Sequence, residues 1–169
     1  MKIVHYQSGE LTGGAARGAY WLHRALVDRG VESYMVISGK ENKGDATVIP
    51  LGSNIILYYK LLLQAYLSSR IVDLYRGRRK EIFSLGWNGV NCTKLPFYEE
   101  ATIVHLHFIN RMVRFRSLRK VKKPVVWTLR DLWPMTGGCH YPNRCNRFKS
   151  QCGRCPALGS NHKRDLSYW

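Results

Sequence analysis

The chain has 169 residues, of which 45% are hydrophobic and 22% charged, so its composition is that of a globular domain and excludes a disordered chain. Its length suits one compact domain with its own core. The 27 Lys and Arg against 11 Asp and Glu give a formal net charge of +16. Such a field concentrates polyanions, whether nucleic acid, anionic lipid or phosphorylated ligands, without selecting among them.

The sequence contains no segment typical of secretion or of membrane spanning. The opening run, residues 1–6, leads directly into a polar, glycine-rich turn, so we expect no signal peptide. The most apolar stretch, residues 55–74, is interrupted by Lys60, Arg70 and Asp73, whereas a membrane span needs about 20 nearly uninterrupted apolar residues. We therefore expect a cytoplasmic protein with reduced thiols.

The first half of the chain alternates between strand and helix patterns. Short apolar runs with β-branched residues predict strands at residues 2–6, 33–38 and 45–51. Apolar residues at helical spacing predict a helix at 15–28, which ends at Arg29-Gly30, and a long amphipathic helix at 54–76.

The second half continues this alternation and then changes character. Two further strands are predicted at 102–108 and 124–129, with a basic helical segment at 111–123 between them. The fold class is therefore α/β, a Rossmann-like doubly wound parallel sheet in one domain over 1–169. Residues 131–160 form a Cys-rich loop within it. The chain stops in what reads as the start of another helix, so we expect a truncated product.

Gly13-Gly14 lies where the first strand passes into the first helix. Adjacent glycines let backbone N–H groups converge on an anion, and the helix N-terminus adds partial positive charge. Arg17, one turn into the helix, is a second candidate ligand for the same anion. The turn matches neither the dinucleotide fingerprint nor a Walker loop. A plain flexible turn remains the alternative.

Polar side chains are predicted at the carboxyl ends of two later strands. His105 and His107 alternate along one strand and so share a face, with His107 nearer the crevice where α/β sheets bind ligands. Arg130 and Asp131 follow the next strand into the same crevice, Arg130 to hold a phosphate or carboxylate and Asp131 to orient a hydroxyl. The alternatives are a buried, hydrogen-bonded histidine and a local ion pair.

Four cysteines fall within one short loop. Cys152 and Cys155 have the spacing of a zinc knuckle, and Cys139 and Cys145 complete a possible four-thiolate site, with His140 as a substitute ligand. The first pair is too widely spaced for a second knuckle. Free thiols and two local disulfides are the alternatives. A metal held by four protein ligands has no open position, so a zinc here would be structural.

The basic segment 111–123 admits several partners. It lacks interleaved aromatic residues apart from Phe115, which argues against nucleic acid. With the apolar face of the 54–76 helix it suits an anionic membrane surface, where each Lys or Arg contributes about 1 kcal/mol. A solvated basic face is an equal alternative.

Three stretches resemble the N-terminal, acceptor-side domain of family-4 retaining glycosyltransferases of the GT-B fold, particularly bacterial members of polysaccharide pathways. They are MKIVH with GGAAR at 13–17, IVHLH at 103–107, and VWTLRDLWPMTGGCHY at 126–141, and the later cysteine pattern continues them. The third stretch is long and specific, and the resemblance spans nearly the whole chain.

The resemblance implies a sugar transfer from a nucleotide-sugar donor to a glycan or lipid-linked acceptor, between two Rossmann-like domains that close on the donor. It places Gly13 and Gly14 at the donor phosphates, where Arg17 is the further candidate ligand named above, and His107, Arg130 and Asp131 beside the acceptor or the transferred sugar. Such transfer needs no metal cofactor, which again makes a zinc structural. The protein is then a hexosyltransferase that works in the cytoplasm or peripherally on the inner face of the membrane.

Two departures from the family pattern matter. Relatives often have histidine where this chain has Arg130, so the catalytic residue stays unknown. The donor-binding domain lies outside these residues, so the chain alone is expected to be inactive. Two other hypotheses remain, a zinc-bearing basic module that binds nucleic acid and a non-catalytic subunit that pairs with a separate donor-binding chain.

Overall fold

The structure, a computed structural model, describes residues 1–168, so Trp169, the last residue of the predicted domain, lies outside the described part. The chain divides into two compact units. The first comprises Met1–Leu63 and Trp87–Arg130, and the second comprises Gln64–Gly86 and the stretch from Asp131 onward.

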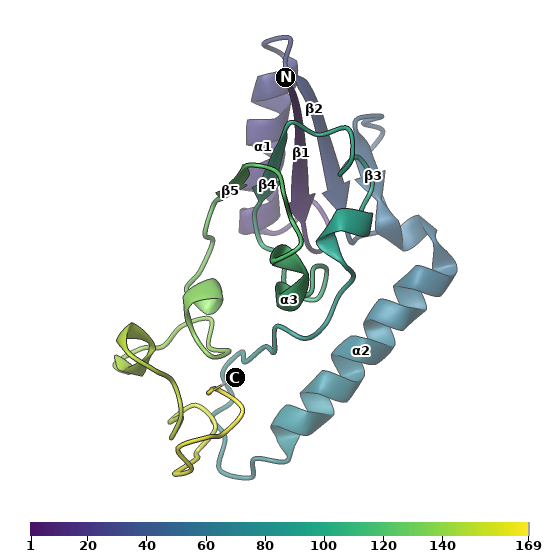
Figure 1. Ribbon diagram of the computed structural model, residues 1–169. Helices are drawn as coiled ribbons and strands as arrows, with labels where there is room; N and C mark the ends of the chain where they lie inside the picture. The colour runs from purple at the N-terminus through teal and green to yellow at the C-terminus, as the bar shows by residue number, and fades with distance from the viewer. Residues whose placement is uncertain (169) are drawn as a thin grey trace. The chain divides into compact units, whose positions relative to one another are not determined.

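The first unit is built on a parallel sheet of five strands, in the order β3-β2-β1-β4-β5 (Figure 1). The strands are β1 (Lys2–Gln7), β2 (Glu32–Ile37), β3 (Val48–Pro50), β4 (Ile103–Leu106) and β5 (Val125–Trp127). The chain moves outward from β1 in one direction and then returns to its other side, so the strand order reverses beside β1. This confirms the predicted α/β, Rossmann-like sheet, and ligands of such sheets bind at that reversal.

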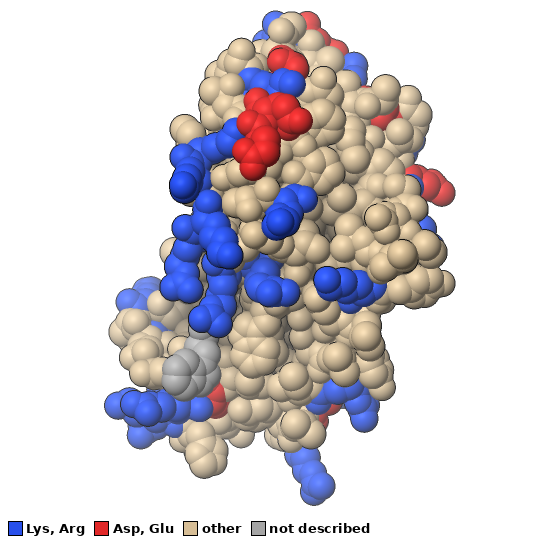
Figure 2. All heavy atoms as spheres, turned by 45° about the vertical axis from the view of Figure 1, so that its right-hand side comes forward, with Lys and Arg blue, Asp and Glu red and all other residues tan. Residues whose placement is uncertain are grey.

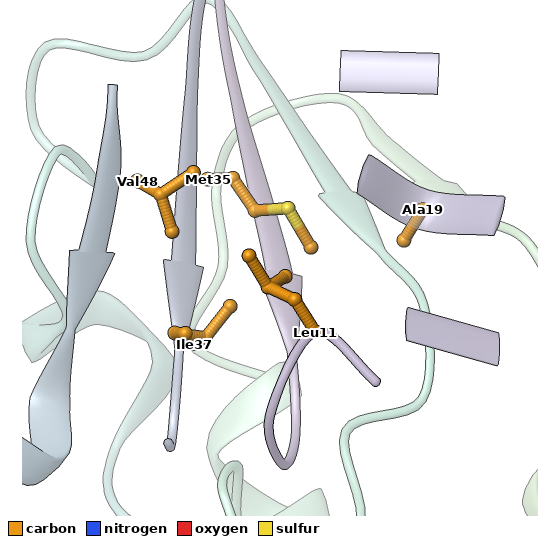
Figure 3. Packing of buried hydrophobic residues seen from close by; sticks show 5 residues of the cluster. All are labelled: Leu11, Ala19, Met35, Ile37 and Val48. Atoms are coloured by element: carbon orange, nitrogen blue, oxygen red, sulfur yellow. The ribbon is translucent and has the colours of Figure 1, made fainter. Parts of the chain in front are cut away.

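Helix α1 (Gly14–Val27) covers one face of the sheet. It buries Ala16, Ala19 and His23, which recur at helical spacing, and the chain leaves it through Gly30 at a φ of +75°. An apolar cluster packs against α1 (Figure 3). Its residues come from α1, β2, β3 and the turn before α1, and they are Leu11, Ala19, Met35, Ile37 and Val48.

The opposite face of the sheet is covered by residues 87–102 and 107–118, which contain little regular structure. Tyr6 of β1 is fully buried there, and its hydroxyl donates to the carbonyl oxygen of Pro96 at 3.1 Å. Ile109, Met112 and Val113 are also fully buried. The prediction of a helix over 111–123 is wrong, because the chain around the buried residues Met112 and Val113 is not helical.

In that segment only α3 (Phe115–Leu118) is helical. Arg111 has a φ of +62°, which a continuing right-handed helix does not allow. Val113 forms an isolated parallel bridge with Val90, so the backbone around it is extended. Burial of Met112 and Val113 therefore decides the local conformation against the helical spacing of the basic residues.

Helix α2 (Ile55–Asp73) begins in the first unit and ends in the second. The predicted long helix is confirmed, but its one-sided amphipathic pattern is not, because Val72 is its only buried residue. Large apolar side chains are exposed along its length, including Ile56, Tyr59, Leu63, Tyr66 and Leu67. None of the helices within residues 1–168 is both long and apolar enough to cross a bilayer.

The second unit has little regular structure beyond its part of α2. Its small apolar core contains Val72, Leu85, Cys155, Ala157 and Leu158. From Asp131 onward the described residues form only turns and two short 3-10 helices, at Trp133–Met135 and Arg147–Lys149. Polar contacts and the cysteines must therefore hold this stretch together.

We predict that shortening a core side chain of the first unit lowers the free energy of unfolding and that shortening an exposed side chain of α2 does not. Ile37 is 0% exposed and Ile56 is 79% exposed. Ile37→Ala should lower the free energy of unfolding by about 2 to 5 kcal/mol, because it leaves a cavity against α1. The same change at Ile56 should alter it by less than about 0.5 kcal/mol. Urea denaturation of both variants is the measurement, and equal losses would contradict the assignment of the core.

Candidate functional site

The glycine turn joins the end of β1 to the start of α1. Gly13 precedes the helix in extended conformation (φ −75°, ψ 156°), and no side chain caps the first turn, which also lacks acidic residues. A Cβ atom added to Gly13 or Gly14 would meet nothing within 4 Å. Both glycines therefore have open space beside them, and the first turn of α1 has no side-chain cap, as an anion-binding turn requires. The phosphate role of Gly13 and Gly14 stays a prediction.

Neighbouring chain holds this turn in place. The Gly9 amide donates to the Ser38 hydroxyl at 2.7 Å, and the Lys40 amide donates to a Glu10 carboxylate oxygen at 2.8 Å. Gly9 has a φ of +88°, a conformation that favours glycine. The turn is thus anchored to the segment that follows β2, which fixes its position at the sheet's carboxyl edge.

Arg17 is exposed on α1, and its guanidinium lies over the ring of Trp21, 5.2 Å from the ring centroid. Trp21 is one turn further along the helix, so the side chain of Arg17 extends away from the glycine turn. The contact with a phosphate that we predicted for Arg17 requires another rotamer and stays a prediction.

Four histidines lie together on the α1 face of the sheet. His5 and His105 are paired in register across β1 and β4, so their side chains share a face, and His107 follows two residues later. His23 of α1 packs against this group, and its ring centroid lies 5.7 Å from that of His5. Its two ring nitrogens bond the hydroxyls of Ser33 and Thr47, both at 2.8 Å.

A directional chain of hydrogen bonds links Arg130, His107 and His5. A guanidinium can only donate, so Arg130 donates to Nδ1 of His107 across 3.2 Å. A neutral His107 then carries its proton on Nε2 and donates it to Nδ1 of His5, 3.0 Å away. His5 in turn is protonated on Nε2. Arg130 thereby selects the tautomer of both rings.

Burial keeps these rings neutral. It lowers the pKa of His107 to about 3, with the His105 ring and the Arg130 guanidinium as lesser causes. Burial likewise lowers the pKa of His5 to about 2 and that of His23 to about 4. The pKa of His105 is lowered by the same cause. The cluster therefore supplies hydrogen-bonding groups without positive charge at neutral pH.

Ring nitrogens of His5, His105 and His107 lie within 4.8 Å of one another, which raises the question of a metal. Each of the three rings, however, has a nitrogen already engaged. His105 bonds the Thr128 hydroxyl at 2.8 Å, and His5 and His107 bond each other. The Arg130 cation beside them opposes a second cation. The cluster fits a polar network better than a metal centre.

Arg130 lies between His107 and helix α1. A Cβ atom on Gly18 would come within 2.9 Å of the terminal nitrogen NH1 of Arg130, so the guanidinium packs on the helix where a side chain is missing. Gly18 lies one helical turn from Gly14 on the same helix face. The structure thus brings together His107 and Arg130, as the sequence predicted, and sets Arg130 one turn from the glycine turn.

Asp131 belongs to the second unit, where both its carboxylate oxygens are engaged. Oδ2 lies 2.6 Å from Nδ1 of His140, and Oδ1 accepts from the backbone N–H of Trp133 at 2.9 Å. Nε2 of His140 bonds the hydroxyl of Ser84 at 2.9 Å. The role of Asp131 at an acceptor hydroxyl stays a prediction.

Sequence reasoning missed this network of Asp131, His140 and Ser84. The three residue types are those of a hydrolase triad, but Ser84 is buried and its hydroxyl lies in a packed interior. The ring of Trp133 stacks on His140, with centroids 5.9 Å apart. The network therefore fastens residues 131–140 to residue 84. Since both ring nitrogens of His140 are taken, His140 does not serve as the substitute metal ligand.

The four loop cysteines, which we call the cysteine cluster, line one cavity of about 20 Å³ in the second unit; they are Cys139, Cys145, Cys152 and Cys155. None of the four forms a disulfide in this structure, and neither does Cys92, which is buried in the first unit. The contact with the Cys139 thiol lowers the pKa of Cys155 below that of an ordinary cysteine. The predicted grouping of four sulfurs is present, and their occupancy stays a prediction.

The basic residues of segment 111–123 are mostly exposed. Arg114, Arg116 and Arg119 are on the surface, whereas Lys123 donates to the backbone carbonyl oxygens of Glu99 and Ala101 at 2.5 and 2.8 Å. On the face shown in Figure 2, Lys and Arg outnumber Asp and Glu. This positive field favours an anionic ligand or surface.

Comparison with known proteins gives one informative similarity. The chain is 26% identical, over 165 residues, to an Escherichia coli (strain K12) protein named "Putative colanic acid biosynthesis glycosyl transferase WcaC". The alignment covers 95% of this chain and 40% of the relative, so the chain spans well under half of that protein's length. No family model matches the chain, and no solved structure matches it.

We predict that the buried histidines make stability depend on pH. His107 has a pKa of about 3 when folded against 6.5 for a free imidazole, so its contribution is present above pH about 6.5 and is lost as pH falls toward 3. Between pH 7 and 5 one such ring should remove about 2 kcal/mol from the free energy of unfolding.

The measurement is urea denaturation at both pH values. His107→Gln should shrink the pH-dependent loss by about that amount, whereas His162→Gln, at an exposed position, should leave it unchanged. An identical pH slope in the parent and in His107→Gln would show that the ring is not held neutral.

Proposed function

We propose that this chain is the acceptor-side part of a glycosyltransferase of polysaccharide synthesis. It would present a glycan or lipid-linked acceptor to a nucleotide-sugar donor. The observation that carries the proposal is the similarity to WcaC over 95% of the chain, combined with a parallel sheet of five strands of the Rossmann-like kind.

The carboxyl edge of β1 and β5 supplies the chemistry that the proposal needs. The uncapped start of α1 at Gly13 and Gly14 is suited to the donor diphosphate, because backbone N–H groups and the helix dipole both favour negative charge. Arg130, one turn away, adds a fixed cation that forms charge-assisted hydrogen bonds with a phosphate or carboxylate oxygen.

His107 acts in this proposal as a positioning residue. Its neutral Nδ1 accepts from Arg130, so it orients the guanidinium without competing for the anion. We propose a retaining transfer of a hexosyl group with no metal cofactor. The nucleotide is held mainly by a second Rossmann-like domain that lies outside these 169 residues.

We further propose that α2 places the protein on an anionic membrane surface, where lipid-linked acceptors reside. Its exposed apolar side chains are followed by the basic residues Arg76, Arg78, Arg79 and Lys80. Apolar insertion and attraction to anionic headgroups together bind a helix at the interface without spanning the bilayer.

For the anion site we predict a loss of affinity on removing Arg130. Arg130→Ala should weaken binding of pyrophosphate or a nucleoside diphosphate about 10- to 100-fold, since charge-assisted hydrogen bonds contribute about 1.5 to 3 kcal/mol. Arg114→Ala removes the same charge from an exposed position in segment 111–123 and should change affinity by less than about twofold. Isothermal titration calorimetry makes the comparison. Equal losses in both variants would indicate unspecific attraction by net charge and would sink the assigned site.

We predict that a negative charge introduced on α2 weakens membrane binding more than the same charge introduced elsewhere on the surface. Leu63→Glu should reduce flotation of the protein with vesicles that contain anionic lipid, because it places a carboxylate among the exposed apolar side chains of α2. Asn161→Glu makes the same change in net charge at an exposed loop position and should have little effect. Binding that is equal for the two variants, or equal for neutral and anionic vesicles, would refute the proposal.

A further inference from the structure

The cysteine cluster has a geometry that neither the sheet nor the proposed transfer uses. Its four sulfur-bearing residues come from three separate turns and line the same cavity of about 20 Å³, which Pro142, Phe148 and Pro156 also line. The cavity has room for a single ion or water molecule but not for an organic ligand. A small space bounded by four thiols and apolar rings points to a metal ion.

The loop around Cys152 and Cys155 is shaped as a knuckle. Gly153 has a φ of +121° and Arg154 a φ of +47°, so the chain reverses between the two cysteines. A Cβ atom on Gly153 would collide with the carbonyl oxygen of Lys163, so the turn is packed where only glycine fits. The Arg154 amide donates to the carbonyl oxygen of His162 at 2.8 Å, which fixes the knuckle against the following chain.

One backbone N–H group is directed at a sulfur of the cluster. The amide of Gly137 donates to the sulfur of Cys152 at 3.3 Å. A hydrogen bond from a backbone amide to sulfur is a contact that supports a metal-bound thiolate.

Basic side chains surround the cluster. Arg147 lines its cavity, and Arg79 and Arg144 line an adjoining one that also contains Cys139, Cys145 and Cys155. Four thiolates around a divalent cation carry a net charge of −2. The guanidinium groups of Arg79, Arg144 and Arg147 are exposed, and Arg79 also pairs with Glu81 at 3.9 Å; together they add positive potential that favours a negatively charged metal site.

The second unit also needs a cross-link. Between Asp131 and residue 168 its described backbone has no strand and no α-helix, and its apolar core is small. Asp165 already supports the knuckle, with its carboxylate accepting from the amide of Cys155 at 2.7 Å and from that of Ser167 at 2.9 Å. A metal bound to all four cysteines would join the three turns at one point.

We propose that the second unit holds a structural zinc ion on four thiolates, those of Cys139, Cys145, Cys152 and Cys155. Four sulfur ligands in a tetrahedron are the preferred set for Zn²⁺ and leave no open position for catalysis. Each thiol releases its proton to solvent as its bond to zinc forms. Among the described residues only the three histidines have ligand atoms all within 4.8 Å of one another, so zinc must draw the sulfurs closer together.

The experiment measures metal content of the purified chain, with no sugar substrate present, so its result is independent of the proposed transfer. We expect one zinc per chain by plasma mass spectrometry. Cys155→Ser should lose at least half of this zinc, because a hydroxyl is a poor ligand for the ion. Cys92→Ala removes a cysteine from the first unit and should keep the full stoichiometry.

A second measurement serves in case Cys155→Ser fails to fold. The parent chain is stripped with chelator under reducing conditions and refilled with Co²⁺, and the visible spectrum of a tetrahedral tetrathiolate should appear at one equivalent. Thiol titration of the folded zinc form should find the four cluster cysteines protected, and chelator should expose them.

Three results would overturn the inference. The first is a reduced, folded chain without stoichiometric zinc that also gives no tetrathiolate spectrum with Co²⁺. The second is a mass showing disulfides among the four cysteines, and the third is stoichiometric iron in place of zinc.

Discussion

The pairing of β1 on both of its edges is the constraint on which the first unit depends. β1 bonds β2 over six residues and β4 over four, all in parallel. Parallel pairing brings the carboxyl ends of these strands to one edge. The glycine turn after β1 and the histidines of β4 therefore meet there, and Arg130 follows from β5.

Burial then determines the chemistry of that edge. Imidazoles held under α1 lose their water and stay neutral, while the guanidinium of Arg130 lies beside them at a half-buried position. The only fixed cation in this polar cluster is thus aligned by a neutral acceptor, Nδ1 of His107. Such an edge offers one aligned cation to an anionic group, which is the feature on which the proposed function relies.

Much of the first unit was predictable from the sequence because its signals are local. The runs at residues 2–6 and 33–38 are apolar and β-branched, and the helix at 14–27 has buried residues at helical spacing. The helix prediction for segment 111–123 was wrong because it relied on the helical spacing of the charged residues. The burial of Met112 and Val113 instead bends the chain into turns. The even distribution of apolar residues around α2 was visible in the sequence, and we interpreted it as one-sided.

The sequence identified several residues of the candidate site but not the contacts that they make. Strand ends placed His107 and Arg130 together correctly. The network of Asp131, His140 and Ser84 joins residues 56 positions apart, and no spacing pattern signals such a contact. The tautomers of His5 and His107 likewise follow only from seeing which donor faces which nitrogen.

Amide chemical shifts recorded during a pyrophosphate titration would test the central idea most directly, that an anion binds at the edge defined by β1. We expect the shifts to concentrate at Gly13, Gly14 and their successors in α1, together with the side-chain Nε–H of Arg130. Shifts confined to the basic segment 111–123, with the glycine turn unchanged, would contradict an anion site at that edge.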